Sequence, residues 1–223
     1  MSQRRSNRPA VTEEEDDPTL DRAINECVRY IFCREGSKIP FKRAEIAKHL
    51  NTTCQTNAGD VNSVISRANT ILKRVYGYKL VQVLSKSGTQ MIVILNKECE
   101  SLPASVTDPL QRRILIAALT HIYMTGGPVK EDDMWKFLEE AGLLEETNHN
   151  GRKLLTHTFT KQMYLLYYKE GEGELARHVF EWGQRATEEL PKLFILNKVA
   201  EAFGKTPEHW YEQYRGATEA MES

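Results

Sequence analysis

The sequence predicts a mainly α fold with small β-hairpin wings, an α+β arrangement of tandem winged-helix domains plus C-terminal helices. Three observations carry this prediction. Segments with apolar residues at helical spacing come in two groups of three, a pair of short β-rich runs follows each group, and the second group starts about 90 residues after the first. Three helices followed by a hairpin are typical of a winged helix, a relative of the helix-turn-helix whose hairpin is called the wing.

A disordered tail is expected over residues 1–18, because this segment has almost no apolar residues to bury. It contains Arg4, Arg5 and Arg8, followed by five consecutive acidic residues that end at Asp17. The three arginines are compatible with a weak nuclear-import or phosphate-binding patch, but spaced arginines in such a tail are more often simply solvated.

The first winged helix is expected over residues 19–97. Apolar residues at i, i+3, i+4 and i+7 indicate an amphipathic first helix, and the same stripe returns in a third helix with Asp60 as its N-cap and Gly77 after its end. The period then becomes alternating, which indicates a hairpin around a glycine-containing loop. The expected helices are 20–36, 41–50 and 60–75, and the expected strands are 79–84 and 90–95.

A linker containing Pro103 is expected over residues 98–108. The order of elements then repeats in a second winged helix with a C-terminal helix, over residues 109–205, and a short terminal helix or tail follows over 206–223. The expected helices of the second domain are 110–125, 131–141, 152–163, 184–190 and 191–203, and its strands are 164–170 and 176–182.

Several large side chains of this second half are assigned by their helical or strand position. Trp135, Leu155 and Trp182 fall at inward positions and are expected to lie in the core rather than on a contact surface. Trp210 and Tyr211 belong to an aromatic cluster beside the terminus, which is expected to pack back onto its own domain, with a partner-facing patch as the alternative.

Composition excludes several classes of protein. The chain has 223 residues with 40% hydrophobic and 27% charged residues, as ordinary soluble globular proteins have, and no apolar run reaches the roughly 20 residues that span a bilayer. No apolar segment follows the first residues, so no secretory signal and no membrane partner are expected. Four scattered cysteines lack zinc-ligand or disulfide spacing, and we expect reduced thiols: Cys27, Cys33, Cys54 and Cys99.

No motif of catalysis is present in the sequence. None of the six histidines stands at metal-ligand spacing from another candidate ligand, and there is no Gly-x-Ser-x-Gly elbow, phosphate-binding loop or Gly-x-Gly-x-x-Gly turn. An enzyme would need a site built wholly from distant residues. The sequence therefore predicts a non-catalytic protein without a cofactor, a metal or a small-molecule substrate.

Basic residues favour contact with duplex DNA. From Lys38 to Lys86 there are nine basic residues and only two acids, and in a winged helix the third helix can enter a major groove while the wing contacts phosphate. The candidates are Lys42, Arg43, Arg67, Lys73, Arg74, Lys79 and Lys86 in the first domain, and Arg152, Lys153 and Lys161 in the second. The alternatives are a solvated basic face, or one that docks on the acidic second half of the chain.

An ordered string of six short motifs lies between Ile122 and Ala186. The motifs are Gly126-Gly127, an acidic run into Trp135, Gly151-Arg-Lys-Leu-Leu-Thr156, Tyr164-Leu165, Phe180-Glu-Trp-Gly183 and Arg185-Ala186. Their order and spacing resemble those of the MAGE homology domain, and a fainter match extends the resemblance over roughly residues 20–205. As the family is known, such domains are paired winged helices that bind proteins and DNA and catalyse nothing themselves.

Within that family the chain is most similar to the ancestral type, a non-SMC subunit of the SMC five-six complex. The resemblance implies a RING-type ubiquitin ligase subunit held mainly through the first winged helix and a kleisin subunit against the second. It also implies a role in DNA repair in the nucleus, on chromatin, with the cytoplasm as a further location. The alternatives are a MAGE-type ubiquitin-ligase adaptor without DNA contact and a sequence-specific transcription regulator. The outward Ser, Thr and Lys residues of the third helix favour phosphate contact over base readout and count against the regulator.

Overall fold

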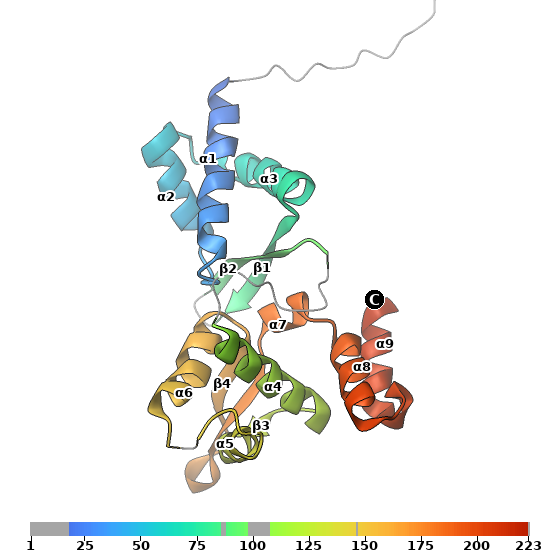
Figure 1. Cartoon of the computed structure of the whole chain (residues 1–223). Coiled ribbons are helices and arrows are strands. Elements are labelled where there is room, and N and C mark those ends of the chain that lie inside the picture. The colour runs from blue at the N-terminus through green and yellow to red at the C-terminus, as the bar shows by residue number, and fades with distance from the viewer. Residues whose placement is uncertain (1–17, 86–87, 98–107, 146, 223) are drawn as a thin grey trace, which may run out of the picture.

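The computed structural model describes residues 18–85, 88–97, 108–145 and 147–222, and it has the predicted α+β fold (Figure 1). The expected tail lies outside the described residues up to position 17, as do Lys86, Cys99 and the expected linker up to position 107. The described chain forms two units that each contain three helices and a hairpin, and further helices follow the second unit.

The first unit packs three helices against a two-stranded sheet. Its elements are α1 (Pro18–Glu35), α2 (Arg43–Cys54), α3 (Val61–Ile71), the π-helical turn η1 (Leu72–Tyr76), β1 (Tyr78–Ser85) and β2 (Gly88–Leu95). β1 and β2 pair antiparallel, with Tyr78 opposite Leu95 and Ser85 opposite Gly88. The predicted apolar stripe of α1 is buried in the core, where it includes Cys27 as a small hydrophobe.

The second unit repeats this order around a three-stranded sheet. Its elements are α4 (Pro109–Thr125), β3 (Val129–Lys130), α5 (Glu131–Glu140), α6 (His149–Lys153), the π-helical turn η2 (Leu154–Phe159), β4 (Leu165–Glu170), the 3-10 turn η3 (Gly173–Leu175) and β5 (Arg177–Trp182). The antiparallel strands lie in the order β3-β5-β4. Trp135 and Leu155 are buried as predicted, whereas Trp182 is only partly buried and donates from Nε1 to the carbonyl of Leu119 at 2.8 Å.

C-terminal helices complete the fold. They are α7 (Gln184–Glu189), α8 (Lys192–Phe203), the 3-10 turn η4 (Pro207–His209) and α9 (Tyr211–Glu222). α9 is longer than the expected short turn and packs back onto the end of α4, since the Tyr123 hydroxyl donates to the carbonyl of Gln213 at 2.7 Å. The Gln213 amide donates in turn to the carbonyl of Met124 at 2.9 Å, which satisfies an end carbonyl of α4.

Three local predictions need correction. Phe41 was expected in the second helix but forms an isolated β-bridge with Met91, because a fully buried phenylalanine reaches the core from an extended segment there. The third helix of the second unit starts at His149 instead of Arg152, since the Asn148 side chain caps it by accepting the N–H of Gly151 at 3.0 Å. Asp60 does occupy the N-cap position of α3, but its side chain makes no cap hydrogen bond.

Candidate functional site

The β1–β2 hairpin lies between the two units and is covered on both faces. One face contributes Met91 and Val93 to the core of the first unit. Side chains alternate between faces along a strand, and the other face places Val83 and Ile92, which are at most 1% exposed, in a cluster with Met163 of the second unit. The hairpin therefore joins the two units, and Figure 1 shows it at their junction.

This position changes what the basic residues of the hairpin can do. The ammonium group of Lys79 lies 3.9 Å from the carboxylate of Glu188 on α7, so it pairs with the second unit. Lys86 lies outside the described residues. Of the two hairpin cations predicted to contact DNA, the one that the structure describes, Lys79, therefore forms an ion pair with a helix of the second unit.

Arg185 on α7 connects the two units through backbone carbonyls. Its guanidinium donates to the carbonyl oxygens of Gln162 at 2.8 Å, Val93 at 2.6 Å and Lys38 at 2.9 Å, and to the carboxylate of Glu189 at 3.1 Å. Two of these carbonyls belong to the first unit and one to the second. The side chain is 1% exposed, so a buried cation with a planar fork of donors holds both units at once.

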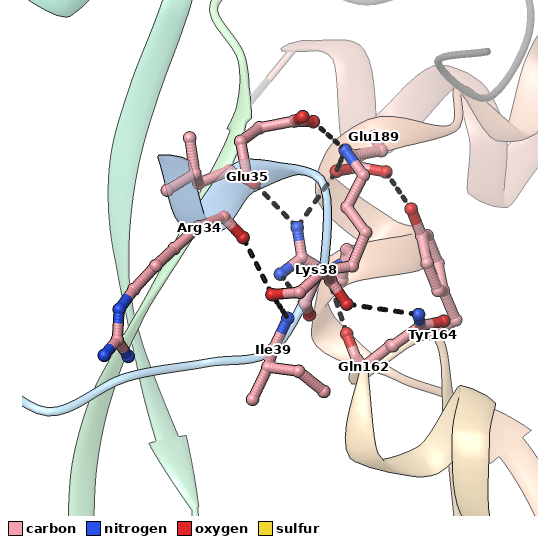
Figure 2. A network of polar contacts seen from close by, with 10 residues as sticks. Arg34, Glu35, Lys38, Ile39, Gln162, Tyr164 and Glu189 are labelled. Carbon is pink, nitrogen blue, oxygen red and sulfur yellow. Dashed lines mark hydrogen bonds and ion pairs between the residues drawn. The ribbon is translucent and has the colours of Figure 1, made fainter. Parts of the chain in front are cut away.

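Two acids and a second cation complete this network. Figure 2 shows Lys38 between Glu35 and Glu189, and the Lys38 ammonium ion-pairs with both carboxylates. The Tyr164 hydroxyl donates to the other oxygen of Glu189 at 2.7 Å. Burial, and then the Glu189 carboxylate, raise the pKa of Tyr164, which keeps the hydroxyl a donor. Two buried acids are thus matched by two buried cations, counting Arg185.

Two unusual backbone conformations occur at residues whose carbonyls accept hydrogen bonds from Arg185. Lys38 and Met163 both have left-handed backbone conformations, with φ of 57° and 65°, which residues other than glycine adopt rarely. The carbonyl of Lys38 accepts from the Arg185 side chain, and the carbonyl of Met163 accepts the Arg185 N–H at 3.0 Å. The unusual conformations therefore occur at carbonyls that face Arg185.

Gly183 allows the chain to approach the Met163 turn. A Cβ atom at position 183 would lie 2.1 Å from the carbonyl oxygen of Met163 and 2.8 Å from the carbonyl carbon of Tyr164, both backbone atoms. Only glycine fits such a backbone approach. The motif Phe180-Glu-Trp-Gly183 thus has a structural reason for its last residue, and the arginine two positions later enters the interface.

One feature of the sequence indicates this interface: a charged residue within an apolar segment. Arg185 sits in a segment whose neighbours Ala186 and Leu190 are buried, and a charged residue inside an apolar pattern often has a buried partner. Its partners are 92 and 147 residues away in the chain for Val93 and Lys38, so the pattern could not name them.

The basic residues of α2 and α3 form the first part of the predicted DNA surface. Lys73 and Arg74 are exposed on η1, and Arg67 is exposed on α3 with its guanidinium 3.8 Å from the Asp21 carboxylate. Lys42 and Arg43 are exposed at the start of α2, where Arg43 donates to the Asn62 side chain of α3 at 2.6 Å.

The second predicted cluster is divided by the structure. The guanidinium of Arg152 lies over the ring of Trp135 at 4.8 Å and 3.8 Å from the Glu131 carboxylate. That carboxylate also accepts from Trp135 Nε1 at 3.1 Å, so Arg152 belongs to a local polar cluster. Lys153 and Lys161 are exposed on the same segment of chain.

An aromatic patch is exposed on the first unit. We call Phe32, Val75 and Tyr76 the first-unit patch; these side chains are 44%, 68% and 46% exposed. The rings of Phe32 and Tyr76 lie 5.1 Å apart, centroid to centroid. Contiguous exposed apolar side chains on a soluble domain mark an interaction surface, and aromatic residues are favoured anchors there.

An apolar groove lies between α4 and α8 of the second half. It has a volume of about 250 Å³ and is lined by Ile116 of α4 and by Phe194, Val199 and Phe203 of α8, among others. Phe203 stands at its rim with 69% of its surface exposed. Apolar grooves of this kind can accept the apolar face of a partner helix or extended segment.

Metal-ligand clusters are absent from the part of the chain that the structure describes. No group of three or more His, Cys, Asp or Glu residues is placed to hold a metal ion there. Burial raises the pKa of the Cys27 thiol to about 12, which removes it as a nucleophile at neutral pH. Within the same residues, every helix is too short or too polar to span a bilayer.

Comparisons with known proteins agree on one family. The model of the MAGE homology domain matches residues 27–193. The human (Homo sapiens) protein "MAGE-like protein 2" is 32% identical over 200 residues, which cover 87% of this chain and 16% of that protein. The human "Non-structural maintenance of chromosomes element 3 homolog" is 30% identical over 205 residues, which cover 87% of this chain and 65% of that protein. The chain thus spans less than two thirds of either relative.

One solved structure is similar along almost its whole length. A chain of the "Nse1-Nse3-Nse4 complex" superposes with a TM-score of 0.76 at 25% sequence identity, and the match covers 91% of this chain and 99% of that chain. The similarity therefore extends to both units and to their arrangement.

Proposed function

Because this chain belongs to the family of MAGE homology domains, we propose that it is a non-catalytic scaffold subunit of the SMC five-six chromosome-maintenance complex. The observation that carries the proposal is the likeness to the element 3 homolog together with the TM-score of 0.76 to a chain of the Nse1-Nse3-Nse4 complex. In this role the chain bridges a RING-type ubiquitin ligase subunit and a kleisin subunit, and it contacts duplex DNA during repair in the nucleus.

The two units offer separate surfaces for the two protein partners. We assign the RING-type subunit to the first-unit patch, because its exposed rings of Phe32 and Tyr76 can be buried without disturbing the core beneath them. We assign the kleisin to the α4–α8 groove, whose apolar walls suit one face of an amphipathic segment. The buried Arg185 network between the units holds the two surfaces at a fixed distance.

Replacing one exposed phenylalanine on each surface by aspartate is expected to weaken the binding of one partner and not of the other. Phe32→Asp should weaken binding of the RING-type subunit about 30-fold and leave binding of the kleisin unchanged, since losing a central aromatic contact costs about 2 kcal/mol. Phe203→Asp should do the reverse. Both side chains are exposed, so the melting temperature should stay the same. Calorimetric titration of each purified partner measures both affinities.

Leu175→Asp is the matched control, because Leu175 is 82% exposed at the tip of the second hairpin and lies on neither surface. If Phe32→Asp and Phe203→Asp weaken the same partner, the assignment of surfaces is wrong.

DNA contact is proposed for the exposed cations that have no buried role. They are Lys42, Arg43, Arg67, Lys73 and Arg74 in the first unit, and Lys153 and Lys161 in the second. If four to six of them engage phosphates, the logarithm of affinity should fall with the logarithm of salt concentration with a slope of about −4 to −5, and sequence should matter little. Fluorescence anisotropy with two unrelated duplexes across a salt series measures both properties.

Charge reversals locate this surface. Lys73→Glu with Arg74→Glu should reduce the salt slope by about 2 if the first unit carries the contact, and Lys153→Glu with Lys161→Glu should do so if the second unit does. Reversal of the exposed Lys136 together with Lys205 is the control for net charge. If all three double reversals change the salt slope equally, the proposal of a defined basic surface is contradicted.

The scaffold role predicts an indirect effect on ubiquitin transfer. In a reconstituted assay with E1, E2 and the RING-type subunit, adding this chain should raise the output, while this chain with E1 and E2 alone should give none. Transfer without the RING-type subunit contradicts the scaffold role. If the chain stimulates the ligase but shows no salt-dependent DNA binding, the result supports the second candidate, a ligase adaptor without DNA contact. The ion pairs of Lys79 with Glu188 and of Arg152 with Glu131 favour this candidate, because they occupy two of the cations predicted to contact DNA.

A further inference from the structure

The turn between α8 and α9 contains the one Ser/Thr-Pro dipeptide of the sequence. Of the eight prolines in the chain, only Pro207 directly follows a residue with a hydroxyl, Thr206. A proline restricts the residue before it to extended conformations, and Thr206 has φ of −90° and ψ of 154°. Figure 1 shows α8 and α9 side by side, joined by this turn. The turn thus presents a hydroxyl on extended backbone directly before a proline.

Thr206 lies in an exposed stretch of chain. Residues 201–206 are all exposed, and the 3-10 turn η4 that follows them contains no buried residue. Gly204 ends α8 with φ of 60°, and a Cβ atom added there would meet nothing within 4 Å. An enzyme can therefore reach the Thr206 hydroxyl without unfolding any part of the core.

A carboxylate lies close to this hydroxyl. The N–H of Glu208, and then the Thr206 hydroxyl, lower the pKa of the Glu208 carboxyl by donating hydrogen bonds to it. A phosphate on the same oxygen carries about −1.5 to −2 charges at neutral pH and adds three strong acceptor oxygens, so it repels a neighbouring carboxylate. Phosphorylation therefore replaces an attraction within the turn by a repulsion.

The same turn positions an aromatic residue of the α4–α8 groove. The N–H of His209 donates to the carbonyl of Thr206 at 3.0 Å, and the N–H of Trp210 donates to the carbonyl of Pro207 at 3.1 Å. The ring of Trp210 then lies edge-on to the ring of Phe203, with the centroids 6.0 Å apart. Phe203 lines the groove and is 69% exposed. Because a ring so exposed has few other contacts, the contact with Trp210 contributes to its orientation.

We propose that Thr206 is a phosphorylation site for a proline-directed protein kinase, and that the phosphate loosens η4 and with it the Phe203 rim of the α4–α8 groove. The effect on the groove rests on the proposed kleisin contact. In the transfer, the hydroxyl oxygen of Thr206 attacks the γ-phosphorus of ATP, the bond from that phosphorus to the β-bridging oxygen breaks, and ADP leaves. The hydroxyl proton passes to the catalytic carboxylate of the kinase.

A kinase assay on the full chain tests the site. After incubation with a purified proline-directed kinase and ATP, peptide mass spectrometry should find a phosphate on Thr206. The phosphate should be lost in Thr206→Ala and in Pro207→Ala, which keeps the hydroxyl but removes the proline. Thr52 is the internal control, because it is an exposed threonine without a following proline. Absence of phosphate from Thr206, or equally fast modification of Thr52, overturns the site.

Hydrogen exchange tests whether the phosphate loosens the turn. The amides of His209 and Trp210, which donate within the turn, should exchange at least about threefold faster in the phosphorylated chain. The amide of Gly183, which donates to the carbonyl of Tyr164 at 2.8 Å in the second unit, is the control and should exchange equally in both forms. Unchanged exchange at His209 and Trp210 overturns the loosening.

Calorimetric titration of the purified kleisin subunit tests the effect on the groove. The phosphorylated chain should bind the kleisin about fivefold more weakly, because part of an aromatic contact is lost, and phosphatase treatment should restore the affinity. Thr206→Ala treated with the same kinase is the matched control, and it should bind as the untreated wild type does.

Phe203→Asp separates the role of Thr206 from the proposed function. If Phe203→Asp weakens kleisin binding and phosphorylation of Thr206 does not, the regulatory role of Thr206 is overturned. If neither change weakens kleisin binding, while Thr206 is phosphorylated and His209 and Trp210 exchange faster, the assignment of the groove to the kleisin is wrong. The phosphorylation site and the loosened turn are then supported.

Discussion

Arg185→Met should lower the free energy of unfolding by about 3–5 kcal/mol, the usual cost of removing one partner from a buried ion pair. The substitution roughly keeps the volume of the side chain. It leaves the carboxylate of Glu189, which is 1% exposed, with the Tyr164 hydroxyl as a donor and with the more distant Lys38, 3.8 Å away, as its cation. It also leaves the carbonyls of Val93 and Gln162 without their donor. For a protein of this size, the melting temperature should fall by about 10 °C, measured by circular dichroism.

The double variant Arg185→Met with Glu189→Met separates charge from packing. It removes one cation and one acid together, and the Lys38–Glu35 ion pair stays intact. Because apolar replacement of both partners of a buried pair is often neutral, the double variant should recover part of the lost stability. A melting temperature of Arg185→Met equal to that of the wild type contradicts the role of Arg185 as the buried link between the units.

Of the glycine-to-alanine substitutions considered, Gly183→Ala is expected to lower the stability of the chain most. Its φ of −82° suits any residue, so the cost comes only from the Cβ atom, 2.1 Å from the Met163 oxygen. The obstacle is backbone and cannot rotate away, so the Met163 turn must move and Arg185 with it. Forced shifts of this kind cost about 1–3 kcal/mol or more, and the melting temperature should fall by at least about 5 °C.

Two other glycines are matched controls for this prediction. At Gly151 an added Cβ meets the side chain of Leu144 at 2.0 Å, and a flexible leucine can move at lower cost. At Gly216 of α9 it meets nothing within 4 Å, so alanine should be neutral or slightly stabilising in the helix. The expected order of stability is Gly216→Ala, then Gly151→Ala, then Gly183→Ala. A Gly183→Ala chain as stable as Gly216→Ala contradicts the close approach.

Much of the fold was predictable because its signals are local. The stripe from Ala23 to Ile31 predicted α1 and its buried side, and the change to alternating polarity after Gly77 predicted the first hairpin. Such patterns depend on periods of 3.6 and 2 residues, which each segment carries by itself. Phe41 was assigned to the wrong element because its partner Met91 is 50 residues away.

The candidate DNA site was less predictable than the fold. All ten predicted residues are basic, but charge in a sequence does not say what lies opposite each side chain. Lys79 pairs with Glu188 across the units, and Arg152 lies over Trp135, whereas Lys73 and Arg74 are exposed as expected. Whether a cation is free is decided by its spatial neighbours.

The sequence by itself determined the helices, the hairpins, the buried stripes and the family to which the chain belongs, since these depend on short-range periodicity and on ordered motifs. Only the tertiary structure decided that the first hairpin is buried on both faces and that Arg185 holds the carbonyls of Val93 and Lys38. Those contacts join residues 92 and 147 positions apart, and no local pattern encodes which distant carbonyl a buried guanidinium will meet. The physical reason is that a buried charge is tolerated only where folding brings its partners together, a property of two packed units and not of either segment.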